Sequence, residues 1–357
     1  MRSSEGLYFE RVDHLRAFAV FLVFFWHLAH DADHLRTVPP SYAPPLPLFL
    51  FSILEEGHLG VALFMTLSGY LFAKIVGNDG VIYHRFLMNR LLRLFPLLGL
   101  LMLVWTAAGH MSVSDFWLGF IREGWPIPGS WSVMVELHFY LVFPLFLLIP
   151  QNYRVAALGT IVLSAVGIRY TVWTLNGEVQ SIAAWSLLGY ADSLLIGMAL
   201  AYSEGRLLSL RYARALAMSG VLAFCAVWHW FNESLGFYAG YPSNSSFWVV
   251  LPTVQALGCA SVIFAYCTGR FTLPERMNAT LRRVGEASYS IYLLHLSFIK
   301  SAMVVLAYAG VLQLSLEIVS AISVPLFALT YLVARVTYER IERPVLQFRM
   351  PYVVRTA

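Results

Sequence analysis

Arg16 and His27 are two ionisable residues that bracket the first strongly apolar stretch of the chain. His27 comes eleven residues after Arg16, which at about 100° per residue places both side chains on one face of a helix. At about 1.5 Å per residue they lie roughly 16 Å apart along the helix axis, about half the hydrocarbon thickness of a bilayer. An ionisable group at that depth is costly to bury and by default marks a pathway or a reaction centre.

His27 is therefore the first candidate for catalysis, since a neutral imidazole that can accept a proton is what a general base requires. The alternative is a core histidine that is hydrogen-bonded to a neighbouring helix. Glu136 lies a few residues inside a later apolar run, at a predicted depth comparable with that of His27. It is the candidate to orient His27, to stabilise its cationic form or to anchor a substrate hydroxyl. A structural ion pair with an arginine is the alternative for Glu136.

Arg90 and Arg93 lie about one turn apart on a basic amphipathic helix that we predict over residues 81–95, on the cytoplasmic side. Guanidinium groups grip phosphates through paired, charge-assisted hydrogen bonds, so this pair is a candidate phosphate site. Anchoring to lipid headgroups is the competing interpretation. Ser68 and His295 are further polar residues inside apolar runs. Ser68 fits close helix packing, whereas a histidine inside the membrane, such as His295, is rarely without a function.

The composition identifies the class of protein that must hold these residues. Of 357 residues, 59% are hydrophobic and 12% are charged, against about 25% charged in a soluble domain. The chain is thus predicted to be a polytopic, all-α integral membrane protein. Its net charge of +4 is too small to indicate nucleic acid as a partner. The 3 cysteines lie in apolar segments without metal-binding spacing, and we expect no metal cofactor.

Apolar runs bounded by proline, glycine and charge predict about ten membrane-spanning helices. We place them at residues 12–30, 57–76, 94–110, 132–150, 154–175, 181–203, 213–232, 247–268, 285–308 and 314–337. With the N-terminus inside, all of the 24 lysines and arginines except Arg36, Arg122, Arg169 and Lys300 fall on the cytoplasmic side. Both termini are therefore predicted to be cytoplasmic. Residues 38–56 are too short and too rich in proline to cross, and we expect an external loop with an interfacial segment.

Six ordered motifs then resemble the membrane-bound acyltransferase family 3, over about residues 8–346. They are VDHLRA at 12–17 with His27 after it, FMTLSGYL at 64–71, the Arg90–Arg93 pair, SWSVMVELHFY at 130–140, SYSIYLLH at 288–295 and YERIERP at 338–344. The resemblance implies one transmembrane acyltransferase domain, residues 1–357, in the inner or plasma membrane. It further implies transfer of an acyl group, commonly acetyl, from cytoplasmic acyl-CoA to a hydroxyl of an extracytoplasmic acceptor, commonly a carbohydrate or glycolipid.

By the same resemblance, Arg16 and His27 form the family's Arg-x10-His pair, Arg90 and Arg93 lie on the coenzyme side, and Glu136 is the fourth-helix glutamate. Three other residues in the shared motifs, Asp13, Trp131 and Ser132, are further site candidates. The chain departs from the family at His14, where a glycine is usual, and at Leu137–His138, where Glu-Gln is usual. Many relatives also carry a soluble C-terminal esterase-like domain, and none is expected here.

Two other classes of function stay open from the sequence. A secondary transporter or flippase for a lipid-linked sugar or acyl group would use His27, Glu136 and His295 as a proton relay. A membrane sensor or scaffold would leave these residues dispensable. Within the acyltransferase hypothesis, direct transfer and a covalent acyl-His27 intermediate are both compatible with the sequence.

Overall fold

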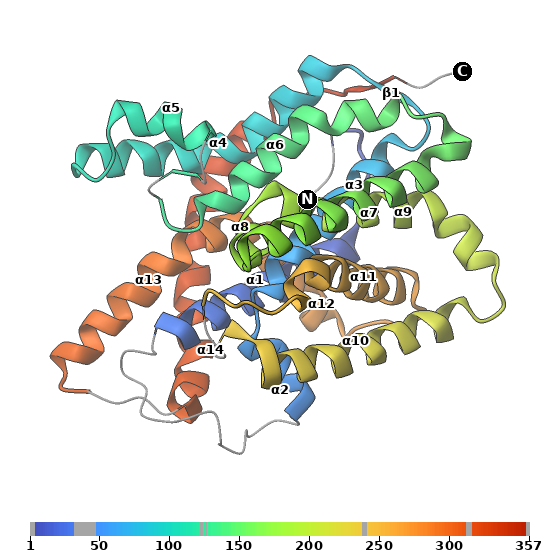
Figure 1. The fold of residues 1–357 in the computed structure, drawn as a ribbon. Coiled ribbons are helices and arrows are strands. Elements are labelled where there is room, and N and C mark those ends of the chain that lie inside the picture. Colours follow the sequence, from blue (N-terminus) through green and yellow to red (C-terminus); the bar gives the residue numbers. More distant parts are fainter. Residues whose placement is uncertain are drawn as a thin grey trace.

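The protein is an all-α integral membrane protein, seen here in a computed structural model that describes residues 4–31, 48–121, 124–125, 127–237, 241–311 and 316–354. In this described part, 9 helices are long and apolar enough to cross a membrane. They are α1 (Glu10–Asp31), α3 (Leu59–Val76), α4 (Tyr83–Ala107), α6 (Ser130–Leu147), α7 (Gln151–Asn176), α10 (Ala213–Leu235), α11 (Phe247–Thr268), α13 (Ser288–Tyr308) and α14 (Leu316–Thr337). Figure 1 shows their arrangement.

A tenth long helix, α9 (Leu187–Ser209), packs along α3, α7 and α11. Asp192, Glu204 and Arg206 are spread along it, so it contains no uninterrupted stretch as apolar as those of the nine. The contact between the two ends of the chain supports its crossing: the carboxylate of Glu5 accepts a hydrogen bond from the backbone N–H of Tyr352 at 2.8 Å. Both ends therefore lie at one end of the molecule, which requires an even number of crossings between them.

Two predicted boundaries were wrong. The amphipathic helix over 81–95 and the span over 94–110 are one helix, α4, which continues through Pro96. Proline removes a single intrahelical hydrogen bond, and neighbouring helices make such a residue tolerable in a membrane. The predicted span over 181–203 is instead broken at Ser186, whose extended backbone separates α8 (Gln180–Trp185) from α9. The Ser186 hydroxyl caps α9 by accepting from the N–H of Gly189, which gives α9 its own N-terminus.

Helix α1 lies near the centre of the bundle and packs against α3, α12 (Glu275–Glu286), α13 and α14 (Figure 1). Small residues on its partners permit this close packing. A Cβ at Gly285 of α12 would lie 1.9 Å from the backbone oxygen of Asp13, and one at Gly60 of α3 would lie 2.3 Å from that of Ala19. The helix that carries Arg16 and His27 is therefore held on both sides by direct contact with neighbouring backbones.

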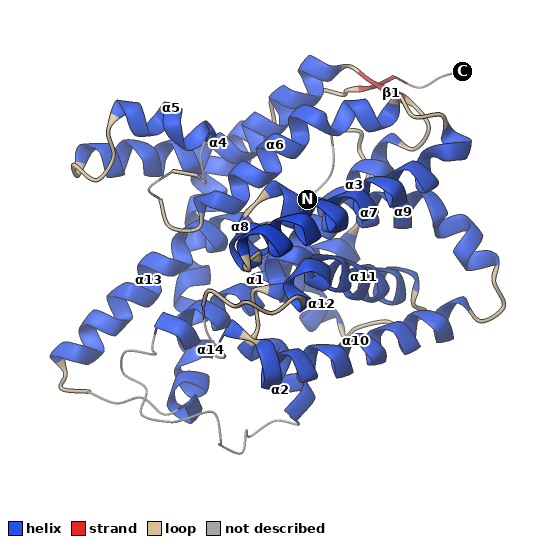
Figure 2. Ribbon diagram, in the orientation of Figure 1, coloured by secondary structure: helices blue, strands red, loops and turns tan. Residues whose placement is uncertain are grey.

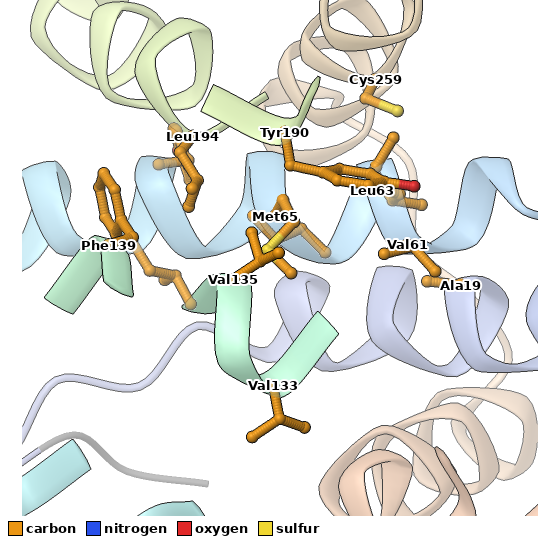
Figure 3. Packing of buried hydrophobic residues seen from close by; sticks show 14 of the residues in the cluster. Ala19, Val61, Leu63, Met65, Val133, Val135, Phe139, Tyr190, Leu194 and Cys259 are labelled. Atoms are coloured by element: carbon orange, nitrogen blue, oxygen red, sulfur yellow. The ribbon is translucent and has the colours of Figure 1, made fainter. Parts of the chain in front are cut away.

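The apolar core beside α1 joins α3, α6, α9 and α11. Figure 3 shows Met65 of α3 between Val135 of α6 and Leu194 of α9, with Tyr190 and Cys259 beyond it. All of these side chains are buried. The core fixes α3 and α6 relative to α1, and these three helices carry most of the predicted site residues.

The remaining elements are short. They are α2 (Leu48–Glu55), α5 (Val113–Ile121), the π-helix η3 (Tyr338–Glu342), α15 (Arg343–Leu346), and the strands β1 (Gly80–Val81) and β2 (Val353–Val354). The two strands pair antiparallel, with Gly80 opposite Val354, and are the only strands in the described chain (Figure 2). This pairing draws the C-terminal segment onto the start of α4. Of the predicted external loop over 38–56, residues 38–47 lie outside the described chain; α2 packs on α10 and is too short to span.

Candidate active site

A cavity of about 160 Å³ lies between α1, α3, α4, α6 and α13, and we call it the arginine chamber. Its lining contains seven residues that the sequence singled out: Asp13, Arg16, Ser68, Arg90, Arg93, Ser132 and Glu136. They come from four helices that are far apart along the chain. The fold therefore brings Arg90 and Arg93, the Arg16 end of α1 and the motif of α6 into one site.

The arginine chamber is electropositive. Four guanidinium groups line it, with Arg349 of the C-terminal segment as the fourth, against the carboxylates of Asp13 and Glu136. Arg16 donates to Asp13 at 3.3 Å, which neutralises one charge of each sign. Burial, followed by the positive charges of Arg93 and Arg90, lowers the pKa of Arg349 to about 10. The remaining charge is a surplus of cations, which favours an anionic ligand.

Aromatic rings surround Arg90. Its guanidinium carbon lies 4.7 Å from the ring centre of Phe72, 5.2 Å from that of Phe86, 5.9 Å from that of Tyr140 and 5.7 Å from that of Tyr352. Arg90 also donates to the Tyr352 hydroxyl at 3.3 Å. Cation–π contacts of this kind hold a guanidinium without neutralising it. Arg90 therefore keeps its full positive charge inside the chamber.

Glu136 accepts hydrogen bonds from the hydroxyl groups of Ser68, at 3.3 Å, and Tyr140. Its charge acts on the two neighbouring cations Arg16 and Arg93. The structure does not pair it with His27, which lines a different cavity. The expected Glu136–His27 contact was wrong. Glu136 lies beside the arginines of the chamber, whereas His27 lies three turns beyond Arg16 along α1. The position of Glu136 agrees with the alternative interpretation, in which this carboxylate is an electrostatic partner of arginines.

His27 lies in a second, much smaller cavity of about 10 Å³, the histidine pocket. Most of its lining is aromatic: Trp26, Trp131, Trp185, Tyr190, Phe237 and Tyr292. The predicted residue Trp131 belongs here, and its ring centre lies 5.1 Å from that of Trp185 and 5.5 Å from that of Tyr190. A cavity of this size admits about one water molecule, so the aromatic side chains fit closely around the His27 ring.

Hydrogen bonds fix the protonation pattern of two histidines. The Nδ1 of His27 lies 2.8 Å from the backbone oxygen of Val23, and the Nδ1 of His295 lies 2.5 Å from that of Tyr292. A carbonyl oxygen only accepts, so each neutral ring carries its proton on Nδ1. The Nε2 of His295 is then an acceptor, 3.1 Å from the Nδ1 of His27. The Nε2 of His27 is left with its lone pair available, which is the arrangement of a general base.

Tyr292 connects the arginine chamber to the histidine pocket. It lines both cavities, as does Val61 of α3. Its hydroxyl lies 2.6 Å from the Ser132 Oγ and donates to the backbone oxygen of Gly129 at 3.2 Å. These bonds anchor the ring between α6 and α13. The two cavities are therefore neighbours along α1, and the Tyr292 side chain stands at the boundary between them.

Four residues of the site were missed by the sequence: Tyr140, Tyr292, Arg349 and Tyr352. Tyr140 and Tyr292 stand inside motifs that the sequence did single out, four residues after Glu136 and three before His295. Helical spacing of three or four would have placed both beside known candidates. Arg349 and Tyr352 carry no such signal, because the pairing of β2 with β1 brings them to the chamber. Among the described residues, no three His, Cys, Asp or Glu side chains are grouped to hold a metal ion.

The chain is similar to two named bacterial proteins. A segment of the chain is 27% identical over 173 residues to the putative peptidoglycan O-acetyltransferase YrhL of Bacillus subtilis (strain 168). It is 26% identical over 173 residues to the peptidoglycan O-acetyltransferase OatA of Listeria monocytogenes. Each match covers 40% of this chain and 24% of the relative, so the chain spans about a quarter of the length of these relatives. No solved structure matches the chain significantly. A family model described as an acyltransferase domain matches residues 9–337, nearly the whole chain, and the chain therefore belongs to the acyltransferase 3 family.

Proposed function

We propose that the chain is a membrane O-acyltransferase. It transfers an acyl group, which we take to be acetyl, from cytoplasmic acyl-CoA to a hydroxyl of an extracytoplasmic carbohydrate. The observation that carries the proposal is the pair of adjoining cavities, one rich in arginine and one containing His27. The names of the two bacterial relatives support acetyl as the group and cell-wall carbohydrate as the class of acceptor. The protein would lie in the inner or plasma membrane.

The arginine chamber is the proposed entry for the donor. Acyl-CoA is an anion with a long neutral pantetheine arm, and the chamber combines a surplus of guanidinium groups with apolar walls such as Phe64, Met65 and Leu71. Placing this chamber at the cytoplasmic face agrees with the arginine-rich loops and with the common position of both chain ends. The acyl end of the arm would point along α1 toward Tyr292 and the histidine pocket.

His27 is the proposed general base. Its Nε2 would take the proton of the acceptor hydroxyl as the oxygen attacks the thioester carbonyl. Collapse of the tetrahedral intermediate would break the C–S bond, and the sulfur of the departing coenzyme would take the proton from His27. His295 and the Val23 carbonyl, both acceptors toward Nδ1, would stabilise the imidazolium that forms between these steps. Bound and aligned reactants gain about 7–11 kcal/mol over free ones, which supplies much of the rate.

Inverted membrane vesicles and acetyl-CoA labelled in its acetyl group test the proposal. We expect ester-linked label in the envelope carbohydrate with the wild-type protein, and about 10²–10⁴-fold less with His27→Ala, the range lost with a general base. His84→Ala is the matched control, because His84 is an exposed histidine at the start of α4, outside both cavities. Label that persists with His27→Ala would show that His27 is not the general base.

The donor assignment is tested in the same vesicles. Replacing Arg90 and Arg93 together by alanine is expected to weaken the use of acetyl-CoA while the protein still inserts and folds. Unchanged dependence on the acetyl-CoA concentration would refute the placing of the donor in the arginine chamber. Mass spectrometry of the quenched protein would separate the two routes: an acetyl group on His27 indicates a covalent intermediate.

A further inference from the structure

A third cavity, about 600 Å³ in volume and larger than the other two, lies outside the arginine chamber. It is formed by α12, the end of α14, the π-helix η3, α15 and the segment that follows. Five arginines line it, Arg282, Arg283, Arg335, Arg343 and Arg349, against one carboxylate, Glu286. We call it the outer basic cavity. None of its residues was a site candidate in the sequence.

Ion pairs account for only part of its positive charge. Arg335 pairs with Glu286 at 3.4 Å and with Glu339 at 2.7 Å, and Arg282 pairs with Glu10 at 3.5 Å. Arg283 and Arg343 have exposed side chains that face the cavity from α12 and α15, and they add two guanidinium groups to these pairs. Guanidinium groups that outnumber the nearby acids form an electrostatic site for an anion, and their planar donors suit phosphate.

Arg349 belongs to both cavities, since its side chain lines the outer basic cavity and the arginine chamber. The two spaces therefore adjoin. The chamber, at about 160 Å³, is below the roughly 300–1,000 Å³ of sites that enclose whole ligands, whereas the outer basic cavity, at about 600 Å³, falls within that range. A donor with a narrow arm and a bulky, multiply charged head could place the arm in the arginine chamber and the head in the outer basic cavity.

We propose that the outer basic cavity binds the phosphate-bearing adenosine nucleotide of coenzyme A, with Arg283 and Arg343 on its 3′-phosphate, while the arginine chamber takes the pantetheine arm. This inference rests on the proposed function and adds a second binding site to it. Burial and then the nearby charges of Arg93 and Arg90 lower the pKa of Arg349, and an anion bound beside these guanidinium groups would offset the repulsion between them. A bound phosphate would relieve that repulsion.

Binding to purified protein in detergent tests the proposal with two probes, adenosine 3′,5′-bisphosphate and acetyl-CoA lacking its 3′-phosphate. Wild-type protein is expected to bind the bisphosphate, and to bind acetyl-CoA at least tenfold more tightly than the dephosphorylated form. Each lost charge-assisted hydrogen bond reduces affinity about tenfold, so Arg283→Gln with Arg343→Gln is expected to weaken acetyl-CoA about 100-fold. That double variant should bind both forms of acetyl-CoA equally.

Arg276→Gln with Arg340→Gln is the matched control. These arginines are exposed on α12 and η3 and do not line the outer basic cavity, so their loss removes the same charge at different places. We expect acetyl-CoA to bind the control variant within about threefold of wild type, since exposed charges contribute little. An equal loss of affinity in both double variants would show that only the net charge matters, and it would overturn the proposed binding site.

Lipid headgroups also carry phosphate groups that arginines can bind. Binding measured in nanodiscs distinguishes a site for the nucleotide from a site for a lipid headgroup. If the site belongs to the nucleotide, bisphosphate binding is similar in discs of phosphatidylcholine and of phosphatidylglycerol at 0.15 M salt. Binding that disappears in phosphatidylglycerol would assign the cavity to a lipid headgroup and overturn the proposal. Acetyl transfer without bisphosphate binding would overturn the nucleotide site alone. Bisphosphate binding without acetyl transfer from acetyl-CoA would overturn the proposed function and leave a nucleotide phosphate site.

Discussion

Replacing His295 by leucine removes the acceptor that faces the Nδ1–H of His27 at 3.1 Å. The Val23 carbonyl, 2.8 Å from the same nitrogen, remains and keeps the proton on Nδ1. The tautomer of His27 is therefore expected to survive. What is lost is one of two acceptors that stabilise the imidazolium during transfer. On the proposed mechanism His295 would be a positioning residue and His27 the catalytic base.

The size of this loss follows from the bond removed. A hydrogen bond to a charged group contributes about 1.5–3 kcal/mol, so the turnover rate of His295→Leu should fall about 10–150-fold. The KM for acetyl-CoA should change little, because His295 does not line the arginine chamber. His27→Ala, which removes the base itself, should lose about 10²–10⁴-fold.

His295→Gln is the decisive companion variant, because its amide oxygen can accept from Nδ1–H whereas leucine cannot. Initial rates of labelled acetyl transfer, measured over a range of acetyl-CoA concentrations, give the turnover rate and KM of each variant. We expect His295→Gln to recover most of the turnover rate. Equal loss in the leucine and glutamine variants, or a loss expressed wholly in KM, would refute the role given to the His295–His27 bond.

Two further variants test the boundary between the cavities and the packing of α1. Tyr292→Phe removes a hydroxyl bonded to Ser132 and to Gly129, which should lower stability by about 1–2 kcal/mol in thermal unfolding. Because these bonds hold the ring at the boundary between the two cavities, their loss should also increase acetyl-CoA hydrolysis without acceptor. Unchanged hydrolysis would contradict the role of this ring in separating the cavities. Gly285→Ala places a methyl group 1.9 Å from the Asp13 backbone oxygen, so it should reduce folded yield and acetyl-CoA affinity together. Gly159→Ala is the control: nothing lies within 4 Å of the added methyl group, and the change should be neutral or stabilising. The same behaviour of both variants would contradict the close packing of Gly285 against Asp13.

The sequence by itself determined the class of protein and most of the helices, and it named candidate site residues that line the two cavities. Apolar runs of about twenty residues have few alternatives to spanning helices, because every backbone polar group must be bonded within the segment. Charged and polar residues inside such runs stand out for the same reason. That is why Arg16, His27 and Glu136 could be named from their types and positions alone, and why the six motifs identified the family.

Helix ends were less predictable, because they depend on single residues. The boundary predicted near residue 95 lies inside α4, which continues through Pro96. The span predicted over 181–203 is interrupted at Ser186, which ends α8 and caps α9. A local pattern does not reveal whether neighbouring helices will support a missing hydrogen bond or whether a serine will adopt the extended backbone of a cap.

Only the tertiary structure decided which site residues meet. Helical spacing gives the depth and face of a residue on its own helix but not the rotation and register of one helix against another. Glu136 was expected beside His27 and instead lies with the arginines, while His27 meets His295 of α13. The C-terminal segment contributes Arg349 and Tyr352 because two short strands, at residues 80–81 and 353–354, pair although they are far apart along the chain. Contacts of that sequence separation arise from packing, and packing is a property of the assembled helices.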